Sequence, residues 1–278
     1  MKKVLASVVA LGCLGVAGAS FAGLPAATGV NGSLHDMNAV VGANADSMGR
    51  VCVFCHTPHN AESNVGQMNT APLWNHDPST RTYQAYEWVT PLNMVDESGN
   101  SFEITGDNAL AGPSRLCMSC HDGVVSVDQH GKAVAQPGTK NMSQINFGRA
   151  DLGGDLTKTH PIGFDYVAIR NHRNTLASVA SAGDSEIVDP EKSFATAVAT
   201  DGTTQGQYNV VTRDGNKRIK DVLFGGTIMT CASCHEVHNK ENAVQDDYKA
   251  GFGLSGAPNY FLYAKQQDSL ICLSCHVK

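Results

Sequence analysis

The sequence predicts a fold with little regular secondary structure, in which short helices surround four large prosthetic groups and a small mixed α/β insert interrupts them. Three observations lead to this fold class. The motif C-x-x-C-H occurs four times, only 6% of the residues are aromatic, and 28 of the 278 residues are glycine. Side chains of this composition supply few large apolar surfaces, so bound cofactors would have to provide much of the core.

The four motifs predict covalently attached haem. In chain order they are Cys52-Cys55-His56, Cys117-Cys120-His121, Cys231-Cys234-His235 and Cys272-Cys275-His276. In this motif the two thiols bond to the haem, and the adjacent histidine is the proximal ligand of the iron. Every cysteine except Cys13 lies in one of these motifs. Thioredoxin-like pairs or shared zinc sites would not explain a histidine after every second cysteine. We therefore expect a multihaem c-type cytochrome with four covalently bound haem c groups.

Residues 1–22 are predicted to be a signal peptide. Lys2 and Lys3 precede an apolar run over residues 4–16, and Ser20 and Ala22 place small residues at the two positions that a signal peptidase reads. Cys13 gives an alternative, a lipoprotein-type cleavage box. The apolar run is too short for a transmembrane anchor, and no later stretch reaches roughly 18 apolar residues. The expected location is the cell surface or the extracellular space, with the periplasm as the alternative.

The charge of the chain argues against nucleic acid as a partner. The formal net charge is −6, and the loss of two lysines with the signal peptide would make the mature chain more acidic. Phosphate binding needs a basic face.

The rest of the chain divides at the motifs. The expected segments are an N-terminal arm at 23–50, a haem-binding region with two motifs at 51–138, an insert at 139–228, and a haem-binding region with the last two motifs at 229–278. The arm has no clean period and is expected to be extended unless something holds it. Pro58 should end a helical turn at the first motif, Pro113 should start a helix that carries the second, and Asp268-Ser269 should cap a helix at the fourth.

The insert is predicted to contain a helix and a hairpin. Asp189-Pro190 is a typical helix start, and the helix would run to Thr200. Residues 208–212 and 217–224 flank Asp214-Gly215, a typical hairpin turn. The insert would either shield haem edges or bind a partner.

Seven further histidines are available as second axial, or distal, ligands. They are His35, His59, His76, His130, His160, His172 and His238. His59 and His238 each follow a proximal histidine by three residues. A histidine so close cannot reach the far side of the same haem, so each is expected to bind the iron of a neighbouring haem. Methionine is the rival ligand, but the histidines suffice for four irons.

The remaining histidines differ in their sequence context. His160 precedes a proline, which biases it toward extended backbone, and is a distal candidate. His35, on the arm, is another, and His76, two residues after Trp74, is a further one. His130 and His172 are expected to be solvated.

Several stretches, taken together, resemble a known family. They read CVFCHTPHN, PLWNH, CMSCHDG, THP, CASCHEVHN and SLICLSCH. Their order is similar to that of the OmcE-like tetrahaem outer-surface c-type cytochromes, which form extracellular filaments. The resemblance implies stacked bis-histidine haems and head-to-tail polymerisation with other copies of the chain. It also implies redox partner cytochromes and electron transfer to external acceptors.

The resemblance also bears on the distal ligands. In that family one axial histidine comes from the adjoining subunit, and His35 is the candidate for this role because it lies on the arm. The resemblance favours His59, His160 and His238 as the other distal ligands, with His76 as an extra candidate.

Two other functions stay open. A monomeric periplasmic electron-transfer shuttle would carry the same haems without forming a polymer. A multihaem oxyanion reductase would need an iron with an open sixth position, and the surplus of histidines favours an electron carrier over such an enzyme. No catalytic residues are predicted.

Overall fold

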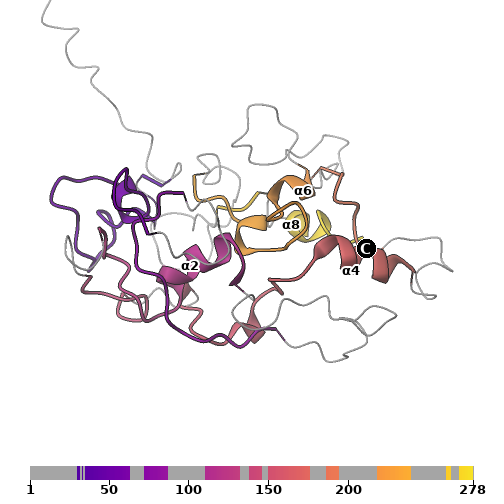
Figure 1. Ribbon diagram of the computed structural model, residues 1–278, viewed down its shortest axis with the longest axis horizontal. Coiled ribbons are helices and arrows are strands. Elements are labelled where there is room, and N and C mark those ends of the chain that lie inside the picture. The colour runs from indigo at the N-terminus through magenta and orange to yellow at the C-terminus, as the bar shows by residue number, and fades with distance from the viewer. Residues whose placement is uncertain are drawn as a thin grey trace, which may run out of the picture.

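The computed structural model describes residues 30–31, 33, 35–62, 72–86, 110–131, 138–145, 150–175, 186–193, 218–238, 261–263 and 269–277. Short helices connected by turns make up this part of the chain. They are η1 (Cys52–Phe54), α2 (Pro113–His121), η5 (Leu156–Lys158), α4 (Tyr166–Thr175), α6 (Ile219–Val222), η6 (Cys231–Ser233) and α8 (Leu270–Leu273). Within the described residues the β-structure consists of isolated bridges. Figure 1 shows the arm and the first motif toward one end of the longest axis, α4 and α8 toward the other, and α2 between them.

Each C-x-x-C-H motif has its first cysteine in one of these short helices, and only the second motif lies entirely within its helix. The second motif ends α2, which begins at Pro113 as predicted, because proline fits the first helical position. The fourth motif begins within α8, which starts directly after Ser269 as predicted. The first motif forms a single 3₁₀ turn that ends at Phe54, well before Pro58.

A second segment of the chain braces the first motif through its backbone. The amide of Thr57 donates to the carbonyl of Leu73 (2.9 Å), and the amide of Asn75 donates to the carbonyl of Cys55 (3.0 Å). Leu73 adopts a left-handed backbone with φ of 55°. We call residues 73–75 the first clamp.

The third motif repeats this arrangement. The amide of Glu236 donates to the carbonyl of Phe261 (2.7 Å), and the amide of Tyr263 donates to the carbonyl of Cys234 (3.0 Å). Phe261 has a φ of 56°, almost the same as Leu73. Residues 261–263 are therefore the clamp of the third motif, which we call the third clamp. The first and third motifs thus form an internal structural repeat that extends beyond the haem motifs and their second histidines.

The fourth motif has a clamp that precedes it in the chain. The amide of Val188 donates to the carbonyl of Cys275 (3.0 Å), and the amide of Val277 donates to the carbonyl of Glu186 (2.9 Å). Ile187 and His276 form the antiparallel bridge between them. Residues 186–188 are the fourth clamp.

The described part of the N-terminal arm is a series of turns instead of an extended segment, and contacts with the rest of the chain hold it, which was the condition for an ordered arm. Met37 and Val40 are buried in a cluster with Phe54. The amide of Asn44 donates to the carboxylate of Asp128 (2.9 Å). Apolar burial and this buried acceptor hold the arm against the first two motifs.

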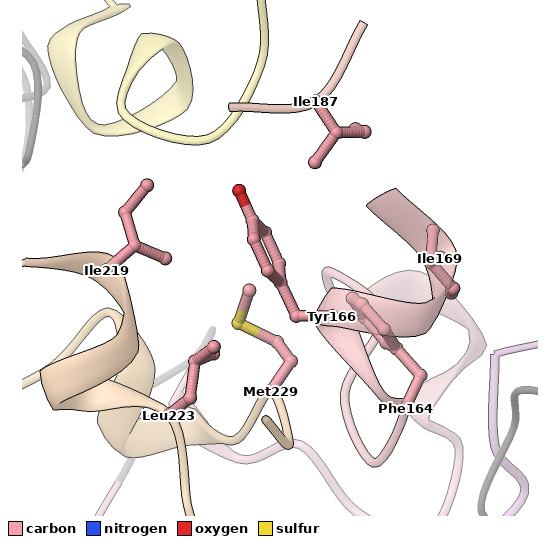
Figure 2. Close-up of a cluster of buried hydrophobic side chains, with 7 residues drawn as sticks. All are labelled: Phe164, Tyr166, Ile169, Ile187, Ile219, Leu223 and Met229. Carbon is pink, nitrogen blue, oxygen red and sulfur yellow. The ribbon is translucent and has the colours of Figure 1, made fainter. Parts of the chain in front are cut away.

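The second half of the chain has its own apolar core, which Figure 2 shows in close-up. Its members are Phe164, Tyr166, Ile169, Ile187, Ile219, Leu223 and Met229. Tyr166 and Ile169 bury one side of α4, a helix that we did not predict, and Tyr166 donates a hydrogen bond to the carbonyl of Val188 (2.8 Å). Cys275 packs against the cluster, so the insert supports the fourth motif.

Two predictions for the insert are wrong. The residues after Asp189 form a turn, closed by a hydrogen bond from the amide of Lys192 to the carbonyl of Asp189 (2.9 Å), instead of starting a helix. The second hairpin strand is replaced by α6, because Ile219 and Val222 are buried at helical spacing and Asp221 accepts the amide of Arg218 (2.9 Å). Residues 194–200 and 208–217 lie outside the described residues.

No helix in the described part of the chain combines the length and the apolar character needed to span a bilayer.

Candidate functional site

The cysteines of successive motifs are neighbours in space. Cys55 of the first motif contributes to the raised pKa of Cys120 in the second, which burial raises most. The thiols of Cys117 and Cys231, from the second and third motifs, share a hydrogen bond that raises the pKa of Cys117 and lowers that of Cys231. None of the eight motif cysteines forms a disulfide. The thiols are therefore free for another covalent partner.

The thiols of the third and fourth motifs are also neighbours in space. Burial raises the pKa of Cys234 to about 12, with Cys275 as the next contribution. The four motifs thus follow one another in space in the order in which they occur in the chain.

Three proximal histidines each face a histidine from elsewhere in the chain. The ring pairs are His56–His238 (centroids 6.0 Å apart), His121–His35 (6.0 Å) and His276–His160 (6.4 Å). An imidazole nitrogen lies about 2.0 Å from a metal, so two imidazoles on opposite sides of one metal have centroids about 6 Å apart. The separations fit two axial ligands of one iron, and each pair joins a proximal histidine to a predicted distal one.

The Nδ1 atoms of four of these rings have oxygen partners. His56 bonds the carbonyl of Pro72 (2.5 Å), His121 that of Ala150 (2.7 Å), His160 that of Pro161 (2.9 Å) and His238 the carboxylate of Glu236 (3.0 Å). An Nδ1–H that donates to oxygen leaves Nε2 as the unprotonated nitrogen. This is the arrangement by which a ligating histidine is oriented toward a metal.

His35 is kept neutral by its surroundings. Burial, followed by the nearby His121 and His235, lowers its pKa to about 3. Its Nδ1 is buried and has no hydrogen-bond partner within the described residues. A neutral imidazole is what metal ligation requires. His35 faces His121 of its own chain, and its role as a ligand for another subunit stays a prediction.

His59 and His76, the other two distal candidates, differ in burial. His59 is exposed, and its carbonyl accepts a hydrogen bond from the Thr57 hydroxyl (2.8 Å). His76 is buried, with its Nε2 atom 3.4 Å from the sulfur of Cys120 and its ring near Trp74. Burial lowers the pKa of His76.

The prediction that His130 is solvated is wrong. It is buried, its ring meets Phe54 edge to face (5.2 Å), and its Nε2 lies 3.3 Å from a carboxylate oxygen of Asp46. His172 is half-buried on α4. Sequence reasoning missed Asp46 because nothing in its local pattern marks a buried acid. It also missed Glu236, whose place directly after a proximal histidine was the available signal.

The residues present fit a bis-histidine haem. Two cysteines and a histidine in and directly after one short helix, with a second imidazole facing the first, are the donors that such a group needs. Within the described residues no group of three or more His, Cys, Asp or Glu side chains is arranged to hold a metal ion by itself. No protein-family model matches the chain, and no curated protein matches it.

Proposed function

We propose that this chain is a tetrahaem c-type cytochrome that carries electrons through closely spaced bis-histidine haems. The observation that supports this most directly is the set of three histidine pairs with centroids 6.0–6.4 Å apart. Random packing of eleven histidines would not be expected to place three proximal histidines, each beside a motif cysteine pair, opposite three predicted distal ones.

A bound haem would supply one-electron chemistry at its iron. The chain's own residues set the conditions for that chemistry. The cysteines of each motif would hold one such group, and the two histidines of a pair would ligate its iron, so that no ligand position would be left for a substrate. The carbonyls of Pro72 and Ala150 hold the imidazoles of His56 and His121 in place, which limits ligand movement.

The ring pairs support a distal ligand for each of three irons. His238 would serve the iron of His56, His35 that of His121, and His160 that of His276. The internal repeat supports the fourth assignment. His238, after the third motif, serves the first, so its counterpart His59 would serve the iron of His235 in exchange. His76 would then not be an iron ligand but a buried residue beside Cys120 of the second motif.

We further propose that the protein is exported and assembles with other copies into an extracellular filament that conducts electrons. The family resemblance of the motif regions supports this. One observation favours the second candidate, a monomeric shuttle. His35 faces His121 within one chain, so this pair needs no second subunit. Redox partner cytochromes are expected in both cases.

The test uses full-length protein produced with haem-attachment machinery. Intact mass should show four haems per chain, and ferric electron paramagnetic resonance should show low-spin signals alone. Fewer than four attached haems would contradict the proposal. A stoichiometric high-spin signal would favour a reductase with an open iron position. Negative-stain microscopy of the same material separates the filament from the shuttle.

A further inference from the structure

We propose that Glu236 is a positioning residue that lowers the reduction potential of the iron held between His56 and His238. This inference rests on the proposed function, since it concerns a residue that acts on a haem ligand. It assigns a role to a carboxylate outside the four motifs and the distal histidines.

Glu236 makes two hydrogen bonds to one predicted ligand. One carboxylate oxygen accepts from the amide of His238 and from its Nδ1, both at 3.0 Å. The side chain of Glu236 is only 20% exposed, so water screens its charge incompletely. A carboxylate that accepts a hydrogen bond from Nδ1–H adds electron density to the imidazole ring and makes it a stronger ligand.

Tyr263 holds the other carboxylate oxygen. Its hydroxyl donates to Glu236 at 3.3 Å, and the residue is buried in the third clamp. Burial and the neighbouring Glu236 raise the pKa of Tyr263, so the hydroxyl stays protonated and remains a donor. Tyr263, Glu236 and the Nδ1 atom of His238 thus form a series of hydrogen bonds, and the ring at its end is the one that faces His56.

The internal repeat provides a natural comparison. Thr57 occupies the position of Glu236 in the first motif, directly after the proximal histidine, and its hydroxyl contacts the backbone of His59 at 2.8 Å. Thr57 is neutral, whereas Glu236 carries a charge. Thr57 and Glu236 therefore steady equivalent histidines, but only Glu236 gives its histidine an anionic acceptor. The His121 and His160 rings have carbonyl acceptors instead.

The sign of the effect follows from charge. A ferric iron carries one more positive charge than a ferrous iron, so a carboxylate on the ligand stabilises the ferric state more. The reduced state is then harder to reach, and the potential falls. Hydrogen bonding from the Tyr263 hydroxyl withdraws part of the carboxylate charge and moderates this effect.

The experiment is a spectroelectrochemical titration of the haem-loaded protein that resolves its four potentials. Glu236→Gln keeps an acceptor oxygen but removes the charge. We expect one of the four potentials, that of the iron between His56 and His238, to rise. The expected rise equals a tenfold change in the ferric-to-ferrous ratio, which is about 59 mV for one electron. The other three potentials should move much less. Tyr263→Phe should shift the same potential in the opposite direction, which a merely structural effect would not do.

Two further variants complete the test. Glu191→Gln is the matched control, because it removes a surface carboxylate whose partners are Arg218 and Lys220. Thr57→Glu should lower one other potential, because it places a carboxylate at the equivalent position. Unchanged potentials in Glu236→Gln, or a shift no larger than in Glu191→Gln, would overturn the inference. Mass and resonance spectra of each variant report haem number and spin state separately, so a failure of the proposed function would be recognised before any potential is measured.

Discussion

Replacing His35 by alanine tests whether the second iron takes its distal ligand from its own chain. The His35 ring lies 6.0 Å from that of His121, and no other distal candidate has a ring contact with His121 among the described residues. In the variant, one of the four haems should lose its sixth ligand. One of four equal low-spin contributions should disappear from the ferric spectrum, and a high-spin signal of the same size should replace it.

The fold around His35 indicates that the arm would stay in place. Met37 and Val40 are 9% and 7% exposed, and each buried side chain of this kind contributes about 1.5–3 kcal/mol. The Asn44–Asp128 hydrogen bond adds a further tie. The loss should therefore be confined to the ligand, and added imidazole should enter the vacant position and restore the low-spin signal.

The assay is spin quantitation on protein diluted to the monomer, with His172→Ala as the control histidine variant. The wild-type monomer and His172→Ala should both be fully low-spin. If the ligand instead came from another subunit, the wild-type monomer would already show one high-spin haem. Four low-spin haems in monomeric His35→Ala would refute the assignment to His121.

Two further predictions concern stability, measured by chemical denaturation of the haem-loaded protein. Gly112 has a φ of 56°, and an added Cβ would lie 2.7 Å from the Phe224 ring, so Gly112→Ala should combine about 1 kcal/mol of backbone strain with about 1–3 kcal/mol of overpacking. Gly225→Ala, at φ of 63° with open space around it, should show the strain alone, and equal losses would contradict this account. Burial disfavours the charged form of Asp128, but hydrogen bonds from three backbone amides and a threonine hydroxyl outweigh it and lower its pKa. Its stabilisation is therefore complete above the unfolded pKa of about 3.9 and is lost as pH falls through the lower folded pKa. Asp128→Asn should show a weaker dependence of unfolding free energy on pH below about 4, and an unchanged slope would count against this role.

The sequence was most informative where chemistry requires fixed spacing. The four motifs and the helix start at Pro113 could be read directly, since attachment to haem and a proline-led helix leave little freedom. For His238, the sequence predicted ligation of a neighbouring haem but did not identify His56 as its partner. Which histidine meets which depends on contacts between residues far apart in the sequence, and spacing does not contain that information.

Other features had no local signal. The clamps at residues 73–75 and 261–263 act through backbone amides and carbonyls. Because many different side chains are compatible with such contacts, the internal repeat leaves little trace in the sequence. The segment of α6 read as a strand because its apolar residues are few and lie next to a typical turn. His130 was misjudged because its burial depends on Phe54 and Asp46, which are distant in the chain.

The positions of the clamps along the chain have a consequence for biosynthesis. An emerging chain presents its amino-terminal residues first. The first and third motifs appear before their own clamps, so their thiols stay reachable by an attachment enzyme until the later segment arrives and closes over the backbone. The fourth motif follows its clamp at residues 186–188, which has already been made when Cys272 and Cys275 appear. If haem is attached as proposed, loading at this last motif would have the shortest time window, and slow delivery of haem would leave it empty before the others.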